Sequence, residues 1–210
     1  MGHVVKDIED LHVQAEKLLR DNVEADSEVS AGGIIKKLNK AIDLLSNHWE
    51  GEDAKVNIND AVHILNGMTR FRNSLGGLAV SAGAVASSYR GIQIKNLANL
   101  PELKKLHTTE MSKRPEYTHT TSGVNIDQEA EQGAKLLEEV KSDIEKFIVE
   151  VNKKKQRMLE ENWTQGGGRD QALAAFDKFE KSFKENYKPT LEKVSTNVRT
   201  AVRNYSVDVK

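Results

Sequence analysis

The side chains that could bind a metal or act as a base are scattered along this 210-residue chain. None of its histidines belongs to an HExxH motif or stands four residues from another histidine. The six are His3, His12, His48, His63, His107 and His119. The chain has no cysteine, which excludes disulfides, thiolate zinc ligands and a cysteine nucleophile. The sequence therefore predicts no metal site and no cofactor.

No group of residues predicts catalysis either. Two pairs of adjacent glutamates fall in helical patterns and are expected to face water, namely Glu138-Glu139 and Glu160-Glu161. Glycines 166–168 precede Arg169, but a phosphate-binding loop also needs a preceding strand and a Lys-Ser/Thr pair, which this sequence lacks. No serine, histidine and aspartate share a local signature of nucleophilic catalysis. We therefore predict that the protein is not an enzyme.

The elements that carry these residues are predicted to be helices. In the first part of the chain, apolar residues recur every three or four positions, which is the spacing of one helix face. They are Val4, Ile8, Leu11, Ala15 and Leu18, followed by Ile34, Ile35, Leu38, Ile42 and Leu45. The weak stretch 24–33 separates the two runs. The helix is therefore either continuous with a soft middle or broken near Gly32 and Gly33, which together cost about 2 kcal/mol of helix propensity. It should end near Asn47.

A second long helix is predicted from Asp53 to about Ile92. Its apolar face contains Ala54, Ile58, Ala61, Leu65, Met68, Leu75 and Ala79. The stretch from Leu75 to Ala86 is rich in glycine, alanine and serine, and such small residues would let a neighbouring helix approach closely. A surface loop is the alternative for these glycines. The stretch is too short to span a bilayer.

Helical periodicity returns in the second part of the chain. It runs from Ile126 to Asn162 and, after an interruption at Trp163 and the glycines that follow, from Ala172 to Tyr205. Pro189 removes one amide donor from the last helix, so we expect a kink near Tyr187. Residues 94–124 between the two parts are rich in threonine and read as a linker, with one or two helical turns expected from Pro101 to Leu106.

The two parts repeat each other. Trp49 and Trp163 are 114 positions apart, and apolar residues match when they are counted from each tryptophan. The matched pairs are Ile34 and Ile148, Leu44 and Met158, Leu45 and Leu159, Ala61 and Ala175, Val62 and Phe176, and Leu65 and Phe179. This pattern indicates a tandem duplication of a helical hairpin.

A single hairpin cannot bury its apolar stripe, so two hairpins should pack together. We therefore predict an all-α fold in which hairpins 1–93 and 126–210 form an elongated four-helix bundle, joined by linker 94–125. About 30 linker residues can span roughly 100 Å, whereas each long helix is about 60 Å long. A linker that can run the length of the bundle favours hairpins that pack antiparallel.

The first turn carries a family resemblance. The stretch IKKLNKAIDLLSNHWEGEDA resembles the WXG family, small helical-hairpin proteins exported by type VII (ESX) secretion systems, and MLEENWTQGGGRDQA resembles it less closely. The resemblance implies that Trp49, Gly51, Trp163 and Gly166 form the turn motifs. Each turn tryptophan would lie beside the other hairpin's C-terminal helix and form a composite surface for the secretion machinery. Its indole N–H is expected to stay near water.

The resemblance also implies an export signal, a tyrosine followed four residues later by an acidic residue. Here Tyr205 precedes Asp208 by three positions, so these two are the candidates. The implied function is that of a type VII secretion substrate, or of a secretion partner for a larger effector protein. The chain would be a monomeric pseudo-dimer, cytoplasmic before export and then secreted without a cleavable signal peptide.

The charge composition and the hydropathy of the chain limit which other partners and functions are predicted. Lys and Arg number 31 against 32 Asp and Glu, and this balance predicts no nucleic-acid partner. Charged residues follow Val4 and Val5 at once, so no cleavable signal is predicted. A membrane-active, pore-forming helical protein that inserts the stretch from Leu75 to Ala86 is the alternative function. A structural adaptor unconnected with export is a further one.

Overall fold

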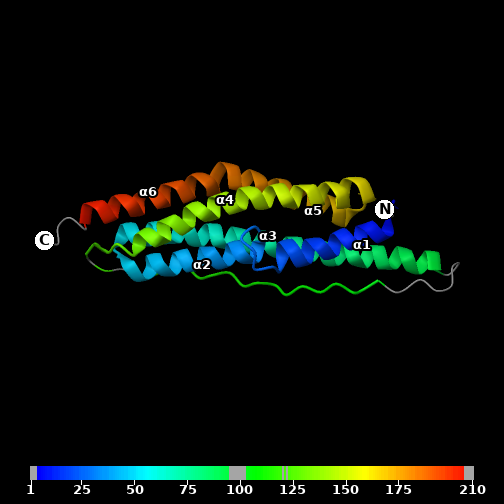
Figure 1. The fold of residues 1–210 in the computed structure, drawn as a ribbon, viewed down its shortest axis with the longest axis horizontal. Helices are drawn as coiled ribbons and strands as arrows, with labels where there is room; N and C mark the ends of the chain where they lie inside the picture. Colours follow the sequence, from blue (N-terminus) through cyan, green and yellow to red (C-terminus); the bar gives the residue numbers. More distant parts are fainter. Residues whose placement is uncertain (1–3, 95–102, 120, 122, 206–210) are drawn as a thin grey trace.

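The computed structural model describes residues 4–94, 103–119, 121 and 123–205. This part of the chain is all-α, as predicted, with short two- or three-residue strands beside the helices. The molecule is elongated, and its helices run along the long axis (Figure 1).

The first run of helix is divided by a loop. Helix α1 (Ile8–Lys17) continues into the wide π-helical segment η1 (Leu18–Val23), and α2 (Ala31–His48) follows after residues 24–30. The break thus falls within the predicted weak stretch but before the glycine pair. The end of α2 at His48 agrees with the prediction to one residue.

Gly32 and Gly33 lie in the first turn of α2 and let the loop fold back onto it. Ser30 caps the helix, with its Oγ accepting a hydrogen bond from the Gly33 amide at 3.0 Å. A Cβ on Gly33 would lie only 2.0 Å from the Ser27 carbonyl oxygen. The glycines are therefore needed for close packing of the loop, and they do not end the helix.

Helix α3 (Glu52–Ile94) is long and continuous, as predicted. It packs against α1, η1 and α2 and runs opposite to them, since the turn at residues 49–51 joins α2 to α3. The stretch 75–86 is helical throughout, so the surface-loop alternative is wrong.

The second part of the chain is also helical. Helix α4 (Ala130–Lys155) and the π-helical segment η2 (Gln156–Asn162) lead to α5 (Gly167–Ser182), η3 (Phe183–Tyr187) and α6 (Lys188–Tyr205). The chain leaves regular α-helix at η3, where the kink was predicted, because Pro189 has no amide hydrogen to donate. Helix α4 packs along α2 and α6, and α3 packs along α5 and α6.

The core runs the length of the molecule between these helices. Near its middle the Phe71 ring stacks on Phe179 with ring centroids 3.8 Å apart, and it meets the edges of Phe147 and Phe176. These rings come from α3, α4 and α5, so the aromatic cluster joins the two parts of the chain.

The linker is ordered where the structure describes it. We call residues 103–119 the strap; it runs alongside α1, α2 and α3 as an irregular strand of chain (Figure 1). The predicted helical turns are absent at residues 103–106, while Pro101 and Glu102 lie outside the described residues. The strap covers part of the small-residue stretch of α3, because Thr108 contacts Gly76 and Leu106 contacts Gly83, and helix α1 also packs against α3.

Candidate functional site

The first turn pairs with the beginning of the second part of the chain. Strand β2 (Trp49–Glu50) forms an antiparallel ladder with β3 (Asn125–Ile126), in which Trp49 faces Ile126. The Asp127 amide donates to the His48 carbonyl oxygen at 3.2 Å. Gly51 then precedes α3 with a φ of 112°, a conformation that favours glycine.

The second turn pairs with the beginning of the chain in the same way. Strand β4 (Trp163–Gln165) is antiparallel to β1 (Val4–Val5), with Val5 opposite Trp163. The Lys6 amide donates to the Asn162 carbonyl oxygen at 2.8 Å, which repeats the bond at the first turn. Gly166, with a φ of 139°, leads into α5. Each turn is therefore held by the segment that opens the other part of the chain.

Both tryptophans are core residues. Each indole is 1% exposed. The Trp163 Nε1 donates to the Gln165 carbonyl oxygen at 2.8 Å, whereas the Trp49 Nε1 is buried and has no hydrogen-bond partner among the described residues. The expectation that the indole N–H groups stay near water is wrong, because the paired strand segments cover both turns.

A polar cluster joins the two parts of the chain beside the second turn. The Asp10 carboxylate accepts hydrogen bonds from Arg157 Nε at 2.8 Å, Asn162 Nδ2 at 2.6 Å and Gln14 Nε2 at 3.0 Å. Burial alone would raise the pKa of Asp10, but these hydrogen bonds and the charge of Arg157 lower it below its ordinary value. The ionised Asp10 carboxylate therefore stabilises the packing beside the second turn.

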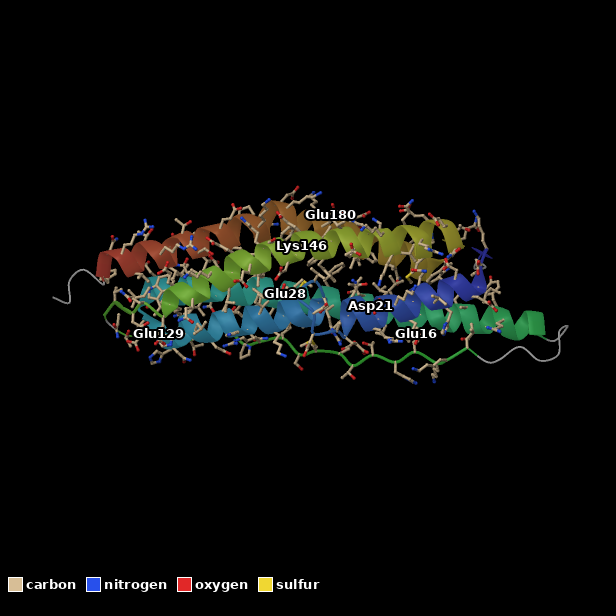
Figure 2. The ribbon with its side chains drawn as sticks, viewed as in Figure 1. Glu16, Asp21, Glu28, Glu129, Lys146 and Glu180 are labelled. Carbon is tan, nitrogen blue, oxygen red and sulfur yellow. The ribbon has the colours of Figure 1, made fainter. Side chains whose placement is uncertain are left out.

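A second polar cluster lies beside the first turn. His48 Nδ1 is 2.9 Å from Asp127 Oδ2, and His48 Nε2 is 3.1 Å from Glu129 Oε2. The Glu129 amide also donates to Asp127 Oδ1 at 2.8 Å. Burial alone would raise the pKa of Asp127, but the hydrogen bonds from His48 and the Glu129 backbone lower it below its ordinary value. Figure 2 shows charged side chains along the whole molecule, with Glu129 near one end.

The candidate export signal is only partly described. Tyr205 ends α6 and is 44% exposed. Asp208 lies outside the described residues. Helix α6 packs against β3, so the end of the last helix lies near the first turn.

The residues examined for other chemistry are not brought together. Among the described residues, no group of three or more His, Asp or Glu side chains is placed to hold a metal ion. Glycines 166–168 form the end of the second turn and the start of α5, next to Trp163. No helix in the described ranges has the length and apolar character needed to cross a bilayer.

Comparisons with known proteins found no matching family model, no matching curated protein and no matching solved structure.

Three asparagines of α3 were missed by the sequence analysis. Asn59, Asn66 and Asn73 hydrogen-bond the strap backbone. Their seven-residue spacing places them on one side of the helix, and this regular spacing of asparagine was the signal available in the sequence.

Proposed function

We propose that this chain is a non-enzymatic substrate of a type VII (ESX) secretion system, or a secretion partner of a larger effector protein. It would be a covalently fused pseudo-dimer of WXG-like hairpins. Hairpins 1–93 and 126–210 would pack antiparallel as an elongated four-helix bundle.

The observation that carries this proposal is the reciprocal pairing of the two turns. The ladder between β1 and β4 and the ladder between β2 and β3 have tryptophan facing a β-branched residue, Val5 in one and Ile126 in the other. The backbone bond next to each ladder is also repeated. In each ladder the turn of one half pairs with the first residues of the other half, as equivalent contacts do across a two-fold axis. The two equivalent ladders therefore support an origin in a symmetric dimer.

The helix lengths support the same proposal. Segments α1, η1 and α2 contain 10, 6 and 18 residues, and α4 and η2 contain 26 and 7. We call the helical segments before each turn tryptophan an arm. Without the loop at residues 24–30, the two arms have the same number of helical residues to within one. The loop is best understood as an insertion into one of two equal arms.

The buried tryptophans change what the recognition surface would be. Because each indole is covered, the surface offered at the first turn would consist of the exposed residues around it, including the end of α6 with Tyr205. The resemblance implied that the turn tryptophan itself forms part of this surface. We propose instead that each indole fixes the shape of the turn.

The test is secretion by the bacterium that produces the protein. We expect the chain, or an effector that depends on it, to disappear from the culture supernatant when the secretion ATPase is deleted, while a cytoplasmic marker stays constant. A Tyr205→Ala variant should reduce export if α6 carries the signal, and Tyr117→Ala in the strap should not. Unchanged extracellular amounts of every protein in the ATPase deletion would overturn the proposal and favour a structural adaptor.

A further inference from the structure

The strap is held through its backbone by the three asparagines of α3. Each side-chain amide donates to the carbonyl oxygen of one strap residue and accepts from the amide of the same residue. Asn59 binds Tyr117 at 3.1 and 2.8 Å, Asn66 binds Arg114 at 2.9 and 2.8 Å, and Asn73 binds Met111 at 2.9 and 3.0 Å. Such closed pairs of bonds recognise a polypeptide backbone regardless of side chain.

The spacing of these bonds fixes the conformation that the groove accepts. Seven residues of α-helix rise about 10.5 Å, and three residues of extended chain cover about 9–10 Å. The asparagines are seven apart on α3, and their partners are three apart on the strap. The groove therefore selects an extended segment that runs opposite to α3.

The groove also has places for side chains. Leu106 is buried against Gly83, and Thr108 contacts Gly76, where an added Cβ would lie 2.9 and 2.7 Å from these side chains. On the α2 side, Arg114 donates to Asp43 at 2.6 Å and to Asn39 at 3.0 Å. These contacts give the strap its register.

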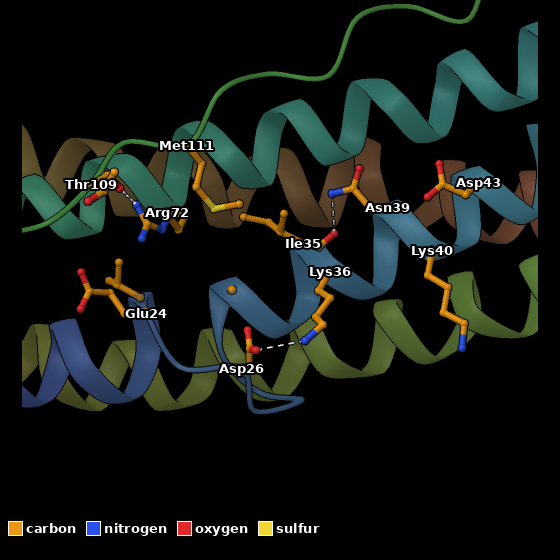
Figure 3. A pocket seen from close by; sticks show the side chains of 12 residues that line it. Glu24, Asp26, Ile35, Lys36, Asn39, Lys40, Asp43, Arg72, Thr109 and Met111 are labelled. Atoms are coloured by element: carbon orange, nitrogen blue, oxygen red, sulfur yellow. Dashed lines mark hydrogen bonds and ion pairs between the residues drawn. The ribbon is translucent and has the colours of Figure 1, made fainter.

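One part of the groove is left open beside the strap. A cavity of about 840 Å³ lies between the loop at residues 24–30, α2 and the strap. Figure 3 shows the Met111 side chain entering it from the strap toward Ile35 of α2. The loop that forms one wall has no counterpart in the second part of the chain, where α4 continues directly into η2.

Arg72 lines this cavity and forms no ion pair with the residues that the structure describes. Its side chain is 6% exposed, and its Nη1 donates to the Thr109 carbonyl oxygen and to Asn73 Oδ1. Among the described residues the Arg72 Nε has no hydrogen-bond partner and Arg72 forms no ion pair, although Glu24, Asp26 and Asp43 line the same cavity. A buried guanidinium in this state is best satisfied by a carboxylate.

We infer that the groove between α2 and α3 is a binding site for an extended segment of another protein, one that carries an aspartate or glutamate opposite Arg72. The strap occupies the site within the chain. The asparagines would bind the backbone of the incoming segment, and its carboxylate would enter the cavity and pair with Arg72. This inference does not depend on export, because it concerns a different surface.

The test uses the full chain and fluorescent peptides with the sequence of residues 104–118. In the chain variant Arg114→Ala, the strap loses its contacts with Asp43 and Asn39. The peptide should bind this variant about tenfold more tightly than the unchanged chain, because the internal competitor is weaker. A peptide carrying Thr109→Glu should gain about tenfold more, whereas Thr109→Gln, of the same size, should gain nothing.

Further chain variants locate the binding. In the Arg114→Ala background, Arg72→Met should remove the gain from the glutamate peptide, whereas Ser74→Ala on the exposed side of α3 should keep it. Circular dichroism checks that each variant is folded.

One set of results would contradict the groove as a binding site, and another would contradict only the role of Arg72. Absence of saturable binding to the Arg114→Ala chain, or an affinity no higher than that of the unchanged chain, would overturn the groove as a site for extended segments. Equal affinity of the glutamate and glutamine peptides would overturn the pairing with Arg72.

Discussion

At the scale of single residues, the two turns depend on backbone conformations that favour glycine. Gly51 has a φ of 112°, and a Cβ on it would lie 2.9 Å from the Gly123 carbonyl oxygen. We expect Gly51→Ala to lower the free energy of unfolding by about 1–3 kcal/mol, because alanine is strained at this φ. Urea denaturation followed by circular dichroism measures the change.

Gly77 provides the matched control. It lies within α3, where a Cβ would meet nothing within 4 Å. Gly77→Ala should therefore raise the free energy of unfolding by about 0.4–1 kcal/mol, since alanine restricts the unfolded chain and favours helix. If the two substitutions had equal effects, the requirement for glycine at the first turn would be refuted.

At the scale of the elements, a buried ion pair joins α2 to α4. Lys37 Nζ lies 2.7 Å from Asp143 Oδ2, and the Asp143 side chain is 5% exposed. Burial would lower the pKa of Lys37, but the bonds to Asp143 and Glu139 raise it. Lys37→Met would leave the Asp143 carboxylate without its main partner, and we expect a loss of about 3–5 kcal/mol in the free energy of unfolding.

The ion pair of Lys36 and Asp26 is the control, because its substitution removes a lysine charge that is not buried. Both of these side chains are 73% exposed, so Lys36→Met should change stability by about 0–1 kcal/mol. Thermal and urea unfolding of both variants give the comparison. Similar losses in the two variants would mean that burial does not set the strength of the Lys37 pair.

The apolar period allowed the helices, including the long α3, to be predicted from the sequence, and Pro189 indicated the departure from regular helix at η3. The apolar period could not reveal the strap, because Asn59, Asn66 and Asn73 hold it by polar bonds to the backbone, which leave no apolar pattern in the linker. The covering of the tryptophans was missed for a similar reason. Strand segments of two or three residues are too short to show an alternating pattern.

At the scale of the whole molecule, acid should loosen both ends. Asp10 and Asp127 have pKa values below their ordinary value near 3.8. A carboxyl whose pKa is lowered in the folded state stabilises the fold above its unfolded pKa, and this contribution is lost as pH falls through the folded pKa. The free energy of unfolding should therefore fall as pH decreases below about 4.

Urea unfolding between neutral and acidic pH measures this dependence. The double variant Asp10→Asn and Asp127→Asn should be less stable near neutral pH and should lose less stability on acidification. The exposed Asp26, whose substitution by asparagine should leave the slope unchanged, is the control. A slope that does not differ between the double variant and the unchanged chain would show that the two ends do not carry the pH dependence.

The mass in solution tests whether one chain completes its own core. The reciprocal ladders, the aromatic cluster around Phe71 and the pair of Lys37 with Asp143 all join the two parts of one chain. We therefore expect light scattering to give a monomer of 23.4 kDa, with small-angle scattering showing an elongated particle. A dimer would be explained most simply by exchange of the two parts between chains, which the long linker permits. Substitution of Asn59, Asn66 and Asn73 by alanine distinguishes the cases, because release of the strap should increase an exchanged dimer and leave a dimer formed by surface contact unchanged.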